Sequence, residues 1–276
     1  MTRKRLIVNA DDFNTDRERN RGILYSAKEG IVTSVSVIAN LPFNSTDMSI
    51  LQRTFGLRIG IHLNLTSGSP LRSLAKSLTD LNNQFYKKNK TWKNLLLGHY
   101  NLNEIKDEFA AQINRLKNLN IIPDHIDGNN HIHIFPGIPK IVAQLSNDFG
   151  ISKIRLPVES FKNRTDYLRP HSIKKYFIGS LAKKAASIFK SFNLQFPDHF
   201  AGIHFPQISN IKSLRKFIMN LPEGTTELMC HPGYCNNTTN KFSTIEREQE
   251  LLNLTHSSVL ADIRHYNINL ISFNEL

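Results

Sequence analysis

Two adjacent aspartates, Asp11 and Asp12, follow the apolar run LIV near the start of the chain. Neighbouring carboxylates repel one another, so this pair is costly unless a cation or a basic group compensates at least one of them. A metal ion bound to one aspartate would leave the other free to act as a base. The pair therefore indicates metal-assisted acid–base chemistry.

The stretch DHIDGNNHIHIF, residues 124–135, carries three histidines and two aspartates. In extended chain the side chains repeat every second residue, so Asn129, His131 and His133 can face the same way, with neighbours ~7 Å apart. We predict that a metal ion here is held by His131 or by the Asn129 carbonyl oxygen, with His133 in a supporting position. Because an asparagine oxygen is a harder and weaker donor than imidazole, a site that used it would hold Zn²⁺ less tightly and tolerate Mg²⁺ or Mn²⁺ better. The alternative is that the asparagines only form a turn.

Short β-branched runs alternate with helical stretches along the chain, beginning with the strand RLIVNA, the helix NRGILYSAKEG and the strand IVTSVSVIAN. A long helix is predicted near the end, over residues 243–267. Such alternation indicates parallel strands with helical crossovers, and roughly seven or eight strands in ~250 residues fit a closed or nearly closed barrel. We predict an α/β fold with one barrel-like domain over residues 1–276 and inserts at 64–98 and 158–199. A doubly wound open sheet is the alternative.

Nearly every expected strand ends on a polar side chain that can do chemistry. These side chains are Asp11, Asp12, Asn40, His62, Asp127, Arg155, His204 and His231. In a parallel barrel such strand ends meet at one mouth, where the active site is built. A lone histidine or aspartate after a strand is more often a turn or cap residue than a ligand, but the joint pattern favours one pocket. His231, just before a Pro-Gly turn, suits proton transfer.

The chain carries 35 lysines and arginines against 23 aspartates and glutamates, a formal net charge of +12. This excess suggests an anionic partner such as nucleic acid, a phosphorylated sugar or an anionic membrane surface. The sequence has no interleaved basic and aromatic groove motif, so we do not expect nucleic-acid binding. No apolar run approaches the ~20 residues that a membrane-spanning helix requires. With two cysteines and no disulfide or zinc-finger spacing, we expect a cytoplasmic protein.

Taken in order, the motifs LIVNADDF, GIHLNLT, HIDGNNHIHIFPG, IRLP and MCHPGY resemble the YdjC-like carbohydrate deacetylases across nearly the full chain. The resemblance implies a distorted TIM-type barrel related to the polysaccharide deacetylases. It also implies hydrolysis of an N-acetyl group on an amino sugar with a divalent metal ion such as Zn²⁺, Mg²⁺ or Co²⁺. By position it implies that Asp12 and His62 are metal ligands, Asp11 is the catalytic base and His231 is the general acid. Related enzymes also suggest self-association.

Two motifs depart from the family pattern, and in the first of them DDF is followed by Asn14 in place of the usual glycine. In the second, the family usually has a histidine ligand where this chain has Asn129. We expect Arg155 to orient Asp11 or to hold a sugar hydroxyl or charged group, and Asp127 and His133 are further candidates for substrate binding. Two other functions remain open: a catalytically weakened sugar-binding protein that has lost a ligand, and a metal-dependent barrel isomerase or phosphodiesterase.

The segment HSIKKYFIGSLAKKAASIFKSF, residues 171–192, has an apolar stripe with lysines mostly away from it. The stripe consists of Ile173, Tyr176, Phe177, Leu181, Ala185, Ile188, Phe189 and Phe192. We expect an insert helix packed on the barrel, with a solvated basic face. The alternative is a basic amphipathic surface that makes peripheral contact with an anionic membrane or glycan.

Overall fold

The computed structural model describes residues 4–54, 56–73, 75–159, 170–203, 208, 210–235 and 244–276. Its strands form an 8-stranded sheet in the order β5-β4-β3-β2-β1-β7-β6, with β8 paired to β1. The strands are β1 (Lys4–Phe13), β2 (Ser34–Val37), β3 (Arg58–Leu63), β4 (His125–Gly128), β5 (Lys153–Ile154), β6 (His199–Ala201), β7 (Gly224–Cys230) and β8 (Asn269–Leu270). The pairings between these strands are parallel.

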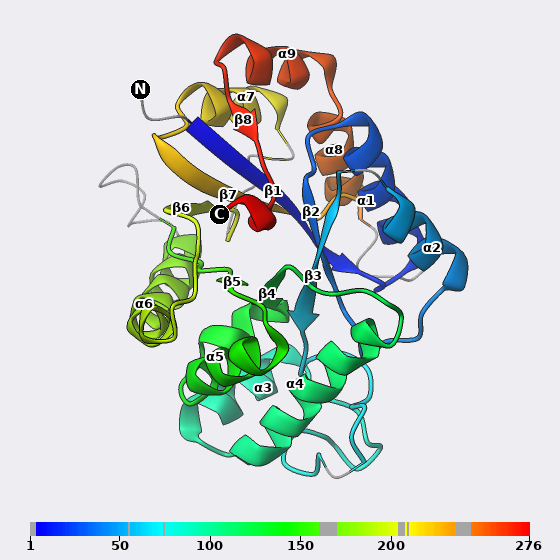
Figure 1. Ribbon diagram of the computed structural model, residues 1–276, viewed down its shortest axis with the longest axis vertical. Coiled ribbons are helices and arrows are strands. Elements are labelled where there is room, and N and C mark those ends of the chain that lie inside the picture. Colours follow the sequence, from blue (N-terminus) through cyan, green and yellow to red (C-terminus); the bar gives the residue numbers. More distant parts are fainter. Residues whose placement is uncertain are drawn as a thin grey trace.

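The sheet curls into a nearly closed barrel with helices around it, as Figure 1 shows. A parallel bridge between Glu159, which follows β5, and Phe200 in β6 links the two ends of the strand order. The helices are α1 (Arg17–Glu29), α2 (Ser45–Arg53), α3 (Lys88–Leu97), α4 (Leu102–Lys117), α5 (Ile138–Phe149), α6 (Pro170–Ser191), α7 (Ile211–Met219), α8 (Ile245–Leu254) and α9 (Ser257–His265). Short 3₁₀ turns are η1 (Asn129–Ile134) and η3 (Phe273–Glu275). The predicted α/β barrel-like fold class is thereby confirmed.

The barrel is held together by apolar strands that are covered on both faces. Leu6, Ile7 and Val8 in β1 are all fully buried, which is why this strand reads as a continuous apolar run rather than an alternating one. Residues of the C-terminal segment cover the end of the barrel where the strands begin. There the Phe273 ring stacks on His125 at the start of β4, with ring centroids 3.9 Å apart. The opposite end, where the strands finish, is left for the polar residues.

Helix ends follow local capping chemistry. The Asp16 carboxylate accepts a hydrogen bond from the backbone N–H of Arg19 at 2.8 Å and begins α1. The predicted single helix over residues 243–267 is wrong, because α8 ends at Leu254 and α9 begins at Ser257. Between them His256 turns its imidazole back to accept from the backbone N–H of Ser258 at 3.1 Å. This side-chain cap starts a new helix where periodicity alone predicted continuity.

The two predicted inserts contact one another. Trp92 in α3, from the first insert, packs against Phe177 in α6, from the second, with ring centroids 5.8 Å apart. Trp92 also lies 5.3 Å from the ring of Phe135, which directly follows η1. Both inserts therefore support the turn that carries the asparagines and histidines of the DHIDGNNHIHIF stretch.

The buried face of α6 differs from the predicted apolar stripe. Ile173 and Tyr176 are 76% and 66% exposed, whereas Ile178 and Ala182 are fully buried. The exposed lysines Lys183, Lys184 and Lys190 lie away from that buried face. Packing on the barrel thus occupies much of the apolar side of the helix. Among the described residues, no helix is long and apolar enough to cross a membrane.

Candidate active site

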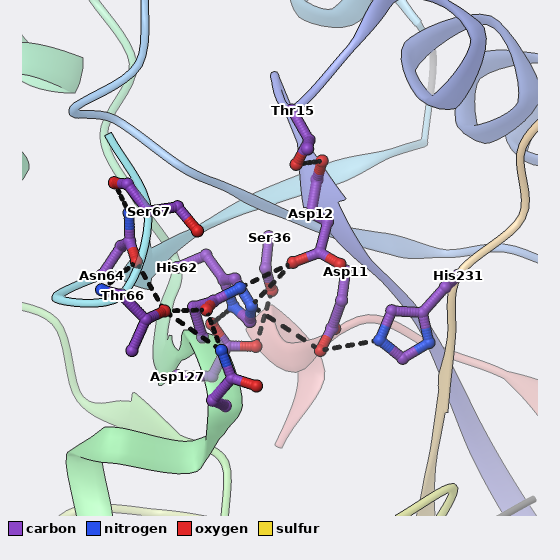
Figure 2. A network of polar contacts seen from close by, with 12 residues as sticks. Asp11, Asp12, Thr15, Ser36, His62, Asn64, Thr66, Ser67, Asp127 and His231 are labelled. Atoms are coloured by element: carbon purple, nitrogen blue, oxygen red, sulfur yellow. Dashed lines mark hydrogen bonds and ion pairs between the residues drawn. The ribbon is translucent and has the colours of Figure 1, made fainter. Parts of the chain in front are cut away.

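Polar side chains from separate strand ends meet at the mouth of the barrel (Figure 2). Asp11 and Asp12 come from the end of β1, His62 from β3 and Asp127 from β4, and His231 directly follows β7. His204, also predicted at a strand end, lies outside the described residues. Asn40 instead ties loops together, since its amide donates to the backbone oxygens of Ser67 and Ser69.

His62 is fixed by a carboxylate on one side and faces the paired aspartates on the other. Its Nδ1 lies 2.6 Å from Asp127 Oδ1, and its Nε2 lies 3.4 Å from Asp12 Oδ1 and 3.9 Å from Asp11 Oδ2. Burial lowers the pKa of His62, but the charges of Asp127 and Asp11 outweigh burial and raise that pKa to about 10. A carboxylate on one ring nitrogen is the usual way to orient a histidine whose other nitrogen binds a metal.

Asp12 leaves the strand in a left-handed conformation, with φ of 69°. Such a backbone is uncommon for a residue other than glycine, and it turns the Asp12 side chain away from the path of the strand. Its Oδ1 accepts a hydrogen bond from Asn129 Nδ2 at 2.9 Å, and its Oδ2 lies 3.4 Å from Arg19 Nη1. Burial raises the pKa of Asp12, but the hydrogen bond from His62 and the charge of Arg19 prevail and hold it well below its usual range.

Arg155 is a completely buried side chain that forms ion pairs with residues of β1, β4 and β7. Its guanidinium binds both oxygens of Asp11, at 2.6 and 2.7 Å, and also reaches Asp127 at 2.9 Å and Glu227 at 2.7 Å. The Asp127 carboxylate also accepts a 2.7 Å hydrogen bond from Ser36. Burial lowers the pKa of Arg155, but the surrounding carboxylates raise it well above its ordinary value. A bidentate pair of this kind fixes the plane of the Asp11 carboxylate.

This burial changes the expected roles of three residues. Arg155, Asp127 and His133 were expected to bind substrate, but the three side chains are fully buried and bonded to the protein itself. His133 Nε2 lies 3.1 Å from the backbone oxygen of Arg155, and burial lowers the pKa of His133 to about 3. Of the two roles that the sequence left open for Arg155, orientation of Asp11 fits the contacts, and contact with a sugar does not.

The stretch after β4 turns instead of remaining extended. Residues 129–134 form η1, and Asn130 and His131 adopt left-handed conformations with φ of 53° and 58°. The predicted alternation of Asn129, His131 and His133 along one face is therefore wrong. Asn129 reaches Asp12, whereas the ring of His131 packs edge-on against Phe200, with centroids 6.2 Å apart.

The cluster is compatible with a divalent ion. Within the described ranges, Asp11, His62 and Asp127 form the group of acids and histidines whose possible ligand atoms lie within 4.8 Å of one another. Arg155 already pairs with Asp11 and Asp127, so the donors not committed to that guanidinium are His62 Nε2 and Asp12 Oδ1. This carboxylate–imidazole pair fits a divalent cation, and His131 is not part of the group.

Asn129 fits the same ion only in part. Its Oδ1 accepts hydrogen bonds from Thr66 at 2.6 Å and from Asn130 at 2.5 Å, while its Nδ2 donates to Asp12. An amide nitrogen is not a metal ligand, so the side chain would have to rotate before its oxygen could serve. The third protein donor is thus the weakest part of the set.

His231 flanks Asp11 on the side away from His62, as Figure 2 shows. Its Nε2 lies 4.0 Å from Asp11 Oδ2, and its side chain is 20% exposed. Burial and the charge of Arg247 lower the pKa of His231 well below its usual value. The loop is anchored by a 2.7 Å hydrogen bond from the His231 backbone N–H to Glu250.

The loop that carries His231 packs closely against α1. A Cβ on Gly22 in α1 would lie 2.5 Å from the Cα of Gly233 in this loop, so glycine is needed at position 22 for the two backbones to approach.

Several residues of the cluster were missed from the sequence. They are Asn9, Ser36, Glu227 and Glu250. Only Glu227 could have been found from the sequence. It is an acidic residue inside the strand that leads to His231, and it lies four positions before that histidine. Because side chains alternate along a strand, residues four positions apart face the same side. Asn9 and Ser36 resemble ordinary strand residues until their neighbours are known.

A parallel α/β barrel with carboxylates and imidazoles gathered at its strand ends is the architecture of a barrel enzyme. Residues 5–265 match the family described as YdjC-like protein, and the chain belongs to this family. The resemblance inferred from the motifs is confirmed.

Relatives across the whole length share a name. A carbohydrate deacetylase from Clostridium beijerinckii is 28% identical over 274 residues, covering 99% of this chain and 100% of the relative. A carbohydrate deacetylase from Mus musculus is 30% identical over 296 residues, covering 99% and 95%. A crystal structure from Enterococcus faecalis V583, described as a cellobiose-phosphate cleavage protein, has a TM-score of 0.80 at 22% identity and covers 99% of each chain. That structural likeness supports the fold.

Proposed function

We propose that this protein is a metal-dependent carbohydrate deacetylase that hydrolyses the N-acetyl group of an amino sugar or of an N-acetylated glycoconjugate. The observation that carries the proposal is Asp11, a buried carboxylate held rigidly by Arg155 between two imidazoles, with His62 Nε2 at 3.9 Å and His231 Nε2 at 4.0 Å. Full-length relatives named carbohydrate deacetylase support the same reaction. The proposal treats residues 1–276 as one catalytic domain.

The ion would be held by Asp12 and His62, with the Asn129 oxygen as a third donor after rotation of its amide. When bound, a divalent ion such as Zn²⁺, Mg²⁺ or Co²⁺ lowers the pKa of its water towards ~7 and polarises the acetyl carbonyl. Asp127 keeps His62 in the tautomer that exposes Nε2. Binding also requires His62 to lose the proton that its raised pKa retains in the metal-free protein.

Asp11 acts as the base in this proposal. Arg155 and the 2.8 Å hydrogen bond from Asn9 hold its carboxylate in one orientation, so that Oδ2 faces both imidazoles. Asp11 takes the proton of the attacking water, and the amine must leave with a proton. His231 has a lowered pKa and is neutral at rest. In this proposal His231 therefore receives from Asp11, whose Oδ2 lies 4.0 Å from its Nε2, the proton taken from the water, and gives that proton to the departing amine.

The substrate is an N-acetylated sugar, and acetate and a free amine are the products. We propose a cytoplasmic location, which the two free cysteines, Cys230 and Cys235, support. The basic exposed face of α6 is compatible with an anionic membrane or glycan as a peripheral partner, and self-association is a further proposal from the resemblance.

Acetate release from a panel of N-acetylated sugars, with and without added Zn²⁺, Co²⁺ or Mg²⁺, tests this function. We expect metal-dependent acetate from at least one sugar, abolished by Asp11→Asn but not by the matched change Asp107→Asn on the exposed face of α4. Binding of the sugars without any acetate would instead indicate a sugar-binding protein. Phosphate released from phosphodiester substrates would indicate the other alternative.

A further inference from the structure

Glu227 is a buried glutamate that is only half satisfied. It lies in β7 and is fully buried. Its Oε1 accepts a 2.7 Å hydrogen bond from Arg155 Nε, while its Oε2 has no hydrogen-bond partner in the part of the chain that the structure describes. A buried carboxylate oxygen without a donor is costly when the group is ionised.

The charge count around Arg155 identifies Glu227 as the carboxylate in excess. One guanidinium serves three carboxylates, and Asp11 takes two of its hydrogen bonds. Asp127 has additional donors in Ser36 and His62, whereas in the described part of the chain Glu227 has Arg155 alone. Where the interior excludes water, an uncompensated carboxylate takes up a proton.

Among the described residues, Arg155 is the cation that acts on Glu227, and no second one adds to it. From β1 Asp11 and from β4 Asp127 act on it as negative charges, and from β6 the residue in register with it is the aromatic Phe200. Burial raises the pKa of Glu227, Arg155 opposes this, and the pKa lies at about 7. Among the three carboxylates, Asp127 is shifted in the other direction, with its pKa held below its usual range by Arg155 and His62 against the effect of burial.

We propose that Glu227 is a positioning residue that binds and releases one proton and thereby sets how much of the Arg155 charge acts on Asp11. The proton is exchanged with solvent, and no other bond changes. With Glu227 neutral, Arg155 is shared by two anions, and Asp11 accepts a proton less readily. With Glu227 ionised, Arg155 is drawn towards a third anion, and Asp11 accepts a proton more readily. The proposal rests on the proposed function in one respect, the role of Asp11 as base.

Two substitutions separate charge from contact. Glu227→Gln retains an oxygen for Arg155 Nε but cannot ionise, whereas Glu227→Asp retains the charge on a side chain one methylene shorter, which lengthens the contact with Arg155. We expect the pH profile of kcat to lose one ionisation near pH 7 in Glu227→Gln and to keep it, at a shifted midpoint, in Glu227→Asp. The matched control is Glu108→Gln in α4, which changes another fully buried glutamate. Glu108 is bonded to Gln112 and to the backbone N–H groups of Leu71 and Arg72, and none of these residues belongs to the Arg155 network. Glu108→Gln should leave the number of ionisations unchanged.

A readout independent of activity completes the test. In the protein labelled with ¹³C at the glutamate carboxyl carbons, we expect one resonance with a midpoint near neutral pH that is missing in Glu227→Gln and present in Glu108→Gln. If Glu227→Gln does not fold, Glu227→Asp should remove the same glutamate resonance. Identical pH profiles in the wild type and Glu227→Gln, or no glutamate carboxyl that titrates near neutral pH, would overturn the proposal. Failure to release acetate from any sugar would instead overturn the proposed function, and the carboxyl titration would still be interpretable.

Discussion

Replacing Arg155 by methionine should destabilise the protein and reverse the pH dependence that this site contributes to its stability. The change removes a guanidinium that binds three buried carboxylates at 2.6 to 2.9 Å, and methionine is long enough to fill part of the same space. Removing one partner of a buried ion pair costs ~3–5 kcal/mol, because the remaining charge stays out of water. Since folded domains are stable by only ~5–15 kcal/mol, the variant should be folded but close to its limit.

The sign of the pH effect follows from Asp127. In the wild type Arg155 and His62 hold the pKa of Asp127 below its unfolded value against the effect of burial, so its contribution to stability is present above the unfolded pKa and is lost as pH falls through the folded pKa. Without Arg155 the buried carboxylates retain protons more strongly when folded than when unfolded. Their contribution is then present below the unfolded pKa and is lost as pH rises.

Urea unfolding followed by circular dichroism between pH 5 and pH 8 measures both effects. The gap in unfolding free energy between the wild type and Arg155→Met should widen as pH rises over this range. Arg215→Met is the matched control, because Arg215 also pairs with a carboxylate in two hydrogen bonds, at 2.6 and 3.0 Å to Asp262, but lies at the surface. It should change stability little at any pH. A loss in Arg155→Met no larger than in the control, or a gap that narrows with pH, would refute the reasoning.

Three further results are expected around the proposed metal site. Asp11→Asn should lower kcat by ~10²–10⁴-fold, the usual contribution of a general base, while metal content after dialysis stays at the wild-type level. Asp12→Asn should lose both activity and bound metal. Equal metal loss in the two variants would contradict the division of roles. Asn129→His should tighten Zn²⁺ binding in a competitive chelator titration, because imidazole is the softer donor. His131→Ala should leave the Zn²⁺ affinity unchanged. A loss of affinity in His131→Ala would restore that histidine as the ligand. Metal affinity should increase from pH 6 to pH 9, because His62, with its pKa raised to about 10, must release a proton to bind an ion. Isothermal titration calorimetry in buffers of different ionisation enthalpy should therefore detect proton release.

The amino-acid sequence alone determined where the chemistry of this protein would lie. Alternating apolar runs and helices specify parallel strands, and parallel strands must end at the same side of a sheet. The sequence could therefore assign four residues to one mouth without coordinates: Asp11, Asp12, His62 and His231. Each lies within or directly after a strand whose apolar run can be recognised in the sequence. The family resemblance then predicts different roles for the two aspartates.

Only the tertiary structure decided which polar groups near the mouth are available and which are committed to the protein. The side chains of Asn129 and His131 separate because η1 turns through left-handed residues, which a two-residue alternation cannot anticipate. The sequence left open whether Arg155 orients Asp11 or holds a sugar group, and the structure shows its buried guanidinium paired with Asp11, Asp127 and Glu227. Strand positions follow from local periodicity, which a sequence carries explicitly. The partners of a buried charge come from strands far apart in the chain, and they are set only when the barrel brings those strands together.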